Sequence, residues 1–213
     1  MVRNPVGRVS EGQLHKDLEK YRLQAIDLGA TDAKVITMDT IIIDERVRAK
    51  CTYPKCPGYG TNANCPPYAM SLDQVRKVVK NFAYGILIKL EVPSLDTAGI
   101  EAREKNLSSP YNRKVTEIIA KIEAQAFYDG YYLAVGFGMG TCKSIFCPDI
   151  DCQALVPGQS CPHRLKARSS MEAVGMDCFR MAANIGWNIY PIGNETSPEE
   201  IPYGLRLGLV LIT

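Results

Sequence analysis

Residues 147–163 read Cys147-Pro-Asp-Ile-Asp-Cys152-Gln-Ala-Leu-Val-Pro-Gly-Gln-Ser-Cys161-Pro-His163. Four residues and then eight separate these cysteines, and the same spacing occurs in Cys51-Thr-Tyr-Pro-Lys-Cys56-Pro-Gly-Tyr-Gly-Thr-Asn-Ala-Asn-Cys65-Pro-Pro67. Both copies end in Cys-Pro and fill the longer gap with glycine and small or polar residues. We interpret the repeat as two loops, residues 51–68 and 142–163, that bind a soft metal.

The bulk composition is that of a soluble globular protein. The 213 residues are 46% hydrophobic and 23% charged, and a chain of this length can bury a substantial core. The formal net charge is only +2, from 25 basic and 23 acidic residues. This balance offers no electrostatic basis for nucleic acid as the main partner.

The termini and apolar runs predict a cytoplasmic protein. The start, Met1-Val-Arg-Asn-Pro5, continues into polar residues and does not look like a secretory signal. Apolar stretches such as residues 207–212 are far too short to span a membrane. Thiols stay reduced in the cytoplasm, so eight cysteines there indicate metal binding rather than disulfides.

Hydrophobic periodicity predicts four helices and several strands in a single domain, residues 1–213. Capping-box patterns begin two of the helices, at Ser71 and Ser169, and Ser109-Pro110 begins another. Residues 93–108 are expected to form a surface loop. The expected helices are residues 12–28, 71–82, 109–127 and 169–185, and the expected strands are 33–37, 40–44, 84–92, 131–135, 188–191 and 204–212. This order favours an α+β or α/β fold, with a mixed β-sheet flanked by helices and two Cys-rich loops leaving it.

The cysteine spacing favours iron–sulfur clusters over zinc. Zinc ligands usually come in pairs two to four residues apart and converge on one ion, whereas ligands of a 4Fe–4S cluster must surround a larger body. Glycine- and proline-containing gaps of eight residues suit that geometry, and a proline also follows a ligand cysteine in bacterial ferredoxins. The second loop supplies a complete set of four thiolates, and the first supplies three. These candidate ligands are Cys142, Cys147, Cys152 and Cys161, and then Cys51, Cys56 and Cys65.

Cys178 is the remaining cysteine, and two roles for it stay open. It is the candidate fourth ligand of the first cluster, which would leave both clusters closed. It also lies on the apolar face of a predicted helix, where a free cysteine behaves as a small hydrophobic residue. In that case one iron would be open to water, substrate or another ligand.

Several weaker features surround the loops. Residues 136–140, Gly-Phe-Gly-Met-Gly, lack dinucleotide-binding spacing and suggest close backbone approach to the cluster or a neighbouring strand. His163 is a candidate cluster ligand or donor, with a surface histidine as the alternative, and Glu172 is interpreted as a capping residue. Basic residues near the loops would offset cluster charge or dock an acidic electron carrier, or else form an ordinary surface. They are Lys50, Lys55, Lys143, Arg164, Lys166 and Arg168.

Taken together, the first loop, the Cys142–Cys161 group and the segment 169–177, Ser-Ser-Met-Glu-Ala-Val-Gly-Met-Asp, resemble a known family. They are similar to predicted metal-binding proteins of unknown function that are widespread in anaerobic archaea and bacteria. The resemblance implies bound iron–sulfur clusters and an anaerobic setting, and names no reaction. The four-residue gaps of the second group and the cysteine at position 178 depart from the pattern expected of that family.

These observations lead to three functional hypotheses. The first is an electron-transfer protein with two 4Fe–4S clusters that serves a partner oxidoreductase or a cofactor-activating system, or works as a homo-oligomer. The second is an enzyme in which an open iron of the first cluster acts as Lewis acid or sulfur carrier. The third is a structural zinc protein, in which the metal contributes folding energy only.

Overall fold

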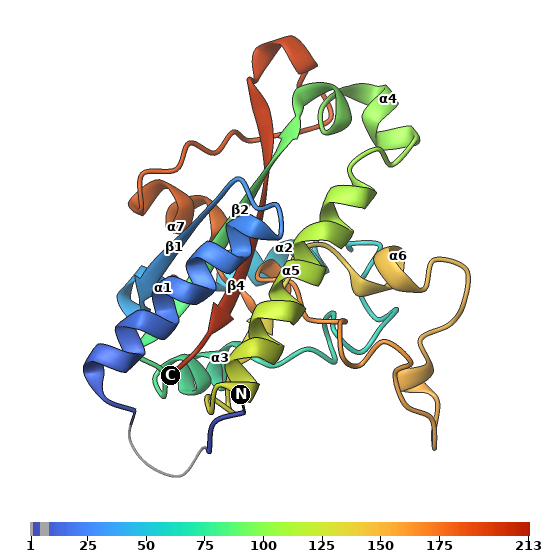
Figure 1. The fold of residues 1–213 in the computed structure, drawn as a ribbon. Coiled ribbons are helices and arrows are strands. Elements are labelled where there is room, and N and C mark those ends of the chain that lie inside the picture. The colour runs from blue at the N-terminus through green and yellow to red at the C-terminus, as the bar shows by residue number, and fades with distance from the viewer. Residues whose placement is uncertain (1, 5–8) are drawn as a thin grey trace.

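A computed structural model, which describes residues 2–4 and 9–213, shows a four-stranded antiparallel sheet in the order β1-β2-β4-β3 (Figure 1). The central pair, β2 and β4, runs from Gly85 opposite Leu211 to Pro93 opposite Tyr203. Residues 1 and 5–8 lie outside the described residues. They belong to the N-terminal stretch that, by its sequence, is not expected to be a secretory signal. The strands are β1 (Asp32–Thr37), β2 (Tyr84–Pro93), β3 (Val135–Phe137) and β4 (Tyr203–Leu211).

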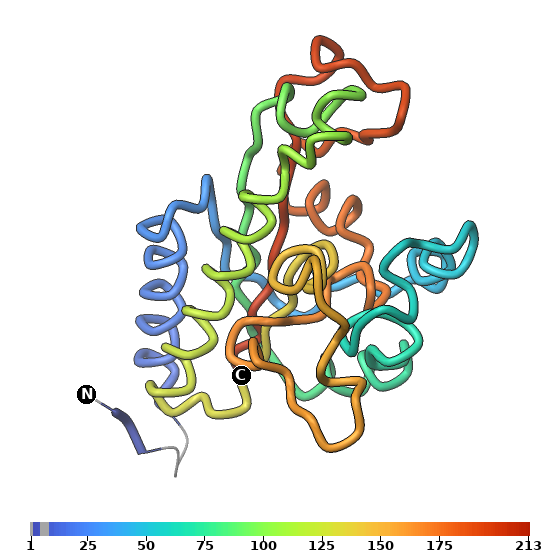
Figure 2. Tube along the Cα trace, turned by 90° about the vertical axis from the view of Figure 1, so that its right-hand side faces the viewer, coloured from blue at the N-terminus to red at the C-terminus, as the bar shows by residue number. Residues whose placement is uncertain are grey.

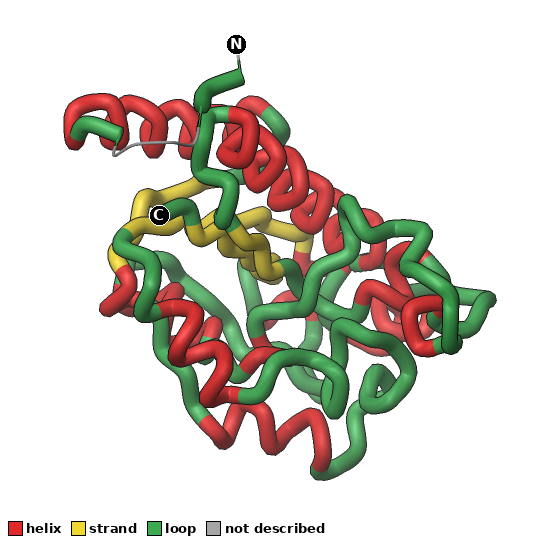
Figure 3. The backbone as a smooth tube through the Cα atoms, turned by 90° about the horizontal axis from the view of Figure 1, so that it is seen from below, coloured by secondary structure: helices red, strands yellow, loops and turns green. Residues whose placement is uncertain are grey.

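Helices cover the sheet unevenly. Two long helices, α1 and α5, lie together on one face of the sheet (Figures 2 and 3), and α6 of the second cysteine loop lies beside α5, where Arg113 donates to the Ile145 carbonyl (Figure 1). None of the described helices is long and apolar enough to cross a lipid bilayer. The α-helices are α1 (Glu11–Asp27), α2 (Glu45–Thr52), α3 (Leu72–Val79), α4 (Gly99–Glu104), α5 (Ser109–Tyr128), α6 (Cys142–Phe146) and α7 (Cys178–Asn184). The 3₁₀ helices are η1 (Met38–Thr40), η2 (Ser94–Asp96), η3 (Gln153–Leu155), η4 (Glu172–Val174) and η5 (Pro198–Glu200).

The first core lies between the sheet and the pair α1–α5. Alternate residues of a strand point to opposite faces, so Ile86 and Ile88 enter this core while Leu87 enters the other. Helix α5 can approach β4 closely because position 208 is glycine, and a Cβ there would collide with Ile119. The helical residues of this core include Leu18, Tyr21, Ala25, Val115, Ile118, Ile119 and Ile122.

The second core lies on the opposite face of the sheet. Helix α3 contributes Val75 and Val79 and begins with the predicted capping box, in which Ser71 and Gln74 bond each other's backbone amides. Segment 171–182 adds Met171, Val174 and Met181. Both cores form from strands and helices outside the two cysteine loops, so the loops rest on an independent scaffold.

The α+β fold with one sheet is confirmed, but the expected mixture of strand directions is not found. Each of the three strand pairs is antiparallel among the described residues. The helices at 12–28, 71–82 and 109–127 and the strands at 33–37, 84–92 and 204–212 are present, with shifts at their ends. Strong apolar periodicity was therefore a reliable guide where an element packs on the sheet.

Other predicted elements were wrong. Residues 40–44 hold the end of η1 and an isolated bridge at Ile43 instead of a strand, and 188–191 form no strand. The predicted loop 93–108 contains η2 and α4, and the strand predicted at 131–135 lies at 135–137. These segments lie at sheet edges or beyond them, where tertiary contacts outweigh local preference.

The helix predicted at 169–185 is divided into η4 and α7. Gly175 has φ +80°, a left-handed conformation that ends the first turn, and its amide donates to the Glu172 carbonyl at 2.9 Å. The side chain of Asp177 then caps α7 by accepting from the Arg180 amide at 3.1 Å. The capping box predicted at Ser169 is not formed: the N-cap of η4 is Met171, which makes no side-chain cap bond, and the nearby Ser170 hydroxyl accepts from the Ala173 amide at 3.0 Å.

Candidate metal centre

The first cysteine loop begins inside a helix that the sequence did not predict. Asp44 caps α2 by accepting from the Arg46 amide at 2.8 Å, and Cys51 lies in the last turn. The Cys56 amide then donates to the Cys51 carbonyl at 3.1 Å, and the Ala69 amide to the Cys65 carbonyl at 3.0 Å. These short-range bonds fold the loop so that its three cysteines face a common space.

That space, which we call cavity one, has a volume of about 430 Å³. The cysteines 51, 56 and 65 line one side of it. Other residues of its wall include 139–141, Ser170 and Glu172. Cys65 is buried, Cys51 is half-buried and Cys56 is exposed, so the cavity is reached from solvent on the Cys56 side.

The second loop is organised by a short helix and a lysine. Thr141 caps α6 with its hydroxyl, which accepts from the Lys143 amide at 3.3 Å. The Lys143 ammonium in turn donates to the carbonyls of Cys147 at 3.3 Å and Ile150 at 2.7 Å. These bonds hold the loop after α6 close to the helix that carries Cys142.

The cysteines 142, 147, 152 and 161 line a second space of about 240 Å³, which we call cavity two. His163 also lines it, and its ring stacks on Phe146 with centroids 5.3 Å apart. The Arg113 guanidinium lies over the Phe146 ring, 5.1 Å from its centroid. The stacked position holds His163 at the cavity wall, where it is half-buried, instead of on the open surface.

Two asparagines of the first loop join the cavities. Asn62 donates to the Thr141 hydroxyl at 2.9 Å, and Asn64 donates to the Cys142 sulfur at 3.4 Å. Both asparagines line cavity two, whereas Thr141 lines cavity one. Sequence reasoning passed over them, because nothing in their local pattern indicates contact with a loop about 80 residues away.

Burial and the neighbouring cysteines raise the pKa values of two thiols, one in each cavity. Burial raises the pKa of Cys142 to about 11, the Asn64 hydrogen bond opposes this, and the negative charges of Cys65, Cys152 and Cys161 raise it further. Burial, assisted by Cys56, also raises the pKa of Cys51. Thiols with raised pKa values stay protonated at neutral pH, so a metal must displace protons when it binds.

Cys178 lies apart from the other seven cysteines. It is buried in the second core, and its thiol donates to the Met176 carbonyl at 3.7 Å. It lines a separate space of about 140 Å³ and neither of the two cysteine cavities. Glu172 is common to that space and to cavity one, so a carboxylate lies between Cys178 and the three thiols.

The basic residues near the loops are partly engaged. Arg168 pairs with Glu123 at 2.7 Å, and Lys166 lies 3.3 Å from Glu117. Lys143 is bonded to the carbonyls of Cys147 and Ile150.

The Gly136–Gly140 segment approaches a neighbouring strand, as predicted, because Gly136 pairs with Val210 of β4. It also lies close to a helix: a Cβ at Gly136 would lie 2.5 Å from Ile119 of α5. Residues 139 and 140 of the same segment do reach cavity one.

The donor set suits a soft, multinuclear group. All eight cysteines are free thiols, and seven of them line the two cavities. Within residues 2–4 and 9–213, no three His, Cys, Asp or Glu side chains converge tightly enough to hold a single metal ion. Thiolates are the protein ligands of iron–sulfur clusters, whose irons are spread around a body. The thiols that line the two cavities are therefore of the donor type that such a cluster takes.

Comparison with known proteins identifies the family. The model of a family described as predicted metal-binding protein (DUF2284) matches residues 34–212, and the chain belongs to that family. The match covers both cysteine loops and the segment with Glu172 and Cys178. No curated protein and no solved structure matches the chain.

Proposed function

We propose that this member of the predicted metal-binding family holds two 4Fe–4S clusters, one in each cavity, and transfers electrons to a partner oxidoreductase or cofactor-activating system. The observation that carries the proposal is the division of seven thiols into sets of four and three around two adjoining cavities. Such clusters supply one-electron redox chemistry.

The contact between the cavities supports transfer within the chain. Asn64 touches the Cys142 sulfur, and the pKa of Cys142 responds to the charge of Cys65 in the other cavity. Ligands from both sets are therefore electrostatic neighbours. A cluster in cavity one, whose wall reaches solvent at Cys56, would be the one that exchanges electrons with the partner.

The open spread of the thiols also separates this proposal from structural zinc. A zinc ion binds sulfur at about 2.3 Å, so its four ligands must nearly touch one another. The described side chains do not converge in that way. The second candidate is an enzyme with an open iron in cavity one, and the observation favouring it is that only three thiols line the larger cavity.

Anaerobic purification with iron, zinc and sulfide quantified together tests the proposal. We expect about eight irons and about eight sulfides per chain, and an electron paramagnetic resonance signal of two interacting clusters after reduction. Cys152→Ala should remove the cluster of cavity two and leave about four irons. Colourless protein that holds zinc and no sulfide would refute the proposal.

A further inference from the structure

Glu172 is the carboxylate in the wall of cavity one. It is the first residue of η4, it is half-buried, and it shares the cavity with the cysteines 51, 56 and 65. On its other side it lines the small space that contains Cys178. This carboxylate is placed beside the incomplete three-thiol set, and its role there rests on the proposed function.

The backbone holds Glu172 against the helix that carries Cys51. Arg48 of α2 donates to the Ala173 carbonyl and, at 3.3 Å, to the Met70 carbonyl. The Asp44 amide, at the beginning of the same helix, donates to the Gly175 carbonyl at 2.9 Å. A Cβ at Gly175 would collide with Leu72, so the turn after η4 has little freedom to move. Glu172 and Cys51 are therefore fixed relative to each other.

The Glu172 carboxylate borders cavity one on one side and the small space with Arg206 on the other. Arg206 is a nearby cation, and burial lowers its pKa more than the carboxylate charge raises it. Among the described residues Glu172 forms no ion pair within 4.0 Å. On the side of cavity one the neighbours are thiols, so a bound metal centre would add positive charge there.

Cys178 contacts the same carboxylate from behind. Its buried thiol lines the small space together with Glu172, within reach of that side chain as well as of the Met176 carbonyl, and Glu172 also lines cavity one with the three thiols. Groups that hydrogen-bond to a ligating carboxylate orient it and tune its affinity for the metal. The neutral thiol has one proton, and a rotation about its C–S bond would direct that proton from the Met176 carbonyl to the carboxylate, whereas a thiolate has no proton to donate.

We propose that Glu172 is the fourth ligand of the cluster in cavity one and that Cys178 is a positioning residue that orients this carboxylate. The site would then be built from Cys51, Cys56, Cys65 and Glu172. A carboxylate oxygen is a harder ligand than a thiolate and binds iron less firmly. The iron at Glu172 is therefore the one that small soft ligands, such as an exogenous thiolate, can reach by displacing the carboxylate.

Three variants, reconstituted anaerobically with iron and sulfide, test the assignment. Glu172→Gln should lose about one of the eight irons and acquire the spectrum of a three-iron cluster. Glu172→Cys should recover the eighth iron. Cys178→Ala should keep the full iron content and change only the spectrum of the cavity-one cluster, and Cys178→Ser should restore that spectrum because a hydroxyl also donates.

The cavity-two cluster is the internal reference for folding, because its four thiols are untouched in every variant. Asp151→Asn is the matched control: this carboxylate is exposed in the second loop and does not line either cavity, so iron content should not change. Loss of an iron in Cys178→Ala, or full iron with an unchanged spectrum in Glu172→Gln, would overturn the ligand assignment alone. Absence of iron from the wild-type protein would instead refute the proposed function.

Discussion

At the scale of single residues, the contacts made by Asn64 are central to the site. Its amide nitrogen donates to the Cys142 sulfur at 3.4 Å, and its amide oxygen accepts from the Ser169 hydroxyl at 3.4 Å. Hydrogen bonds to cluster sulfurs withdraw negative charge from them and are one determinant of reduction potential. Under the proposed function, Asn64 would tune the cavity-two cluster from the loop that lines cavity one.

Asn64→Ala should lower the reduction potential of the cavity-two cluster. Loss of the N–H···S bond leaves more negative charge on the Cys142 sulfur and disfavours the added electron. The expected shift is about 20–60 mV, equivalent to about 0.5–1.4 kcal/mol for one electron. Potentiometric titration followed by electron paramagnetic resonance measures it. In the control Ser169→Ala the donor to sulfur remains, so a smaller shift is expected, and equal potentials in wild type and Asn64→Ala would contradict the prediction.

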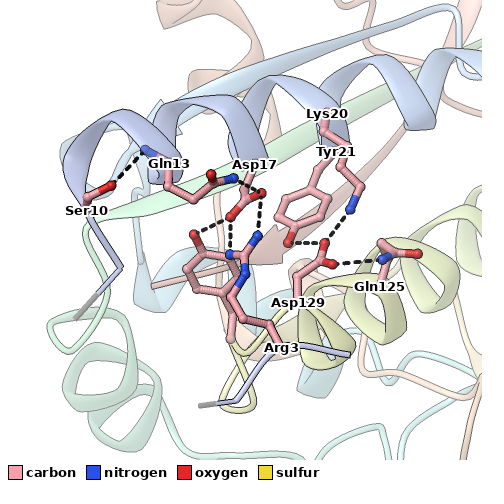
Figure 4. A network of polar contacts seen from close by, with 9 residues as sticks. Arg3, Ser10, Gln13, Asp17, Lys20, Tyr21, Gln125 and Asp129 are labelled. Atoms are coloured by element: carbon pink, nitrogen blue, oxygen red, sulfur yellow. Dashed lines mark hydrogen bonds and ion pairs between the residues drawn. The ribbon is translucent and has the colours of Figure 1, made fainter. Parts of the chain in front are cut away.

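At the scale of elements, a buried polar network fastens α1 to the end of α5 and the N-terminal segment. Figure 4 shows the Arg3 guanidinium facing Asp17 and the Tyr21 hydroxyl facing Asp129. Asp17, only 3% exposed, also accepts from Tyr131 at 2.9 Å. Burial alone would raise the pKa of Asp17, but the hydrogen bonds from Arg3, Tyr131 and Gln13 outweigh it and hold the pKa below its usual value.

Asp17→Asn should lower the free energy of unfolding at pH 7 by about 2–3 kcal/mol, because charged hydrogen bonds to Arg3 and Tyr131 are lost. The folded-state pKa of Asp17 is depressed, so its contribution is present above the unfolded-state value of about 3.9 and is lost as the pH falls through the folded value. Denaturant titrations from pH 7 to pH 3 should therefore show the two proteins converging in acid.

Glu19→Gln is the matched control for this network. Glu19 lies on the same helix and pairs with Arg22 at 2.6 Å, but its side chain is 52% exposed. An exposed pair contributes little, so the expected change is below about 0.5 kcal/mol. If Asp17→Asn were as mild as Glu19→Gln, the buried network would not be what holds α1 in place.

At the scale of the whole molecule, the two hydrophobic cores and the two cysteine loops are built from different residues. The cores are made by the sheet, α1, α5, α3 and the segment 171–182, and nearly all their residues lie outside 51–68 and 142–163. The loops are held mainly by short-range backbone bonds and by the contacts of Asn62 and Asn64. Bound metal would therefore order the loops more than the scaffold.

Removal of the metal should loosen the loops and leave the sheet intact. Hydrogen exchange of the metal-free protein should become fast in residues 51–68 and 142–163, while the amides of β2 and β4 stay as protected as in the loaded protein. Exchange measured by mass spectrometry before and after chelation tests this. Loss of protection throughout β2 and β4 would show that the metal holds the entire fold, as in zinc fingers.

Local patterns sufficed where the physical cause was local. The Ser71–Gln74 capping box, the helix after Pro110 and the apolar strand 84–92 depend on neighbouring residues in sequence, and the structure contains all three. The helix predicted at 169–185 is interrupted at Gly175, whose left-handed conformation ends the first turn at a position where a Cβ would collide with Leu72. Edge segments failed similarly, because their conformation depends on partners distant in sequence.

The sequence by itself determined the donor chemistry: two repeated sets of cysteines, their spacing and the helices and strands with strong periodicity. Only the tertiary structure decided the sheet order, the contact of the two loops through Asn62 and Asn64, and the placement of Glu172 between Cys178 and cavity one. The physical reason is the sequence separation over which each kind of interaction acts. Residue type and periodicity act over a few positions, whereas Asn64 and Cys142 are 78 residues apart and meet only because the folded sheet brings their loops together.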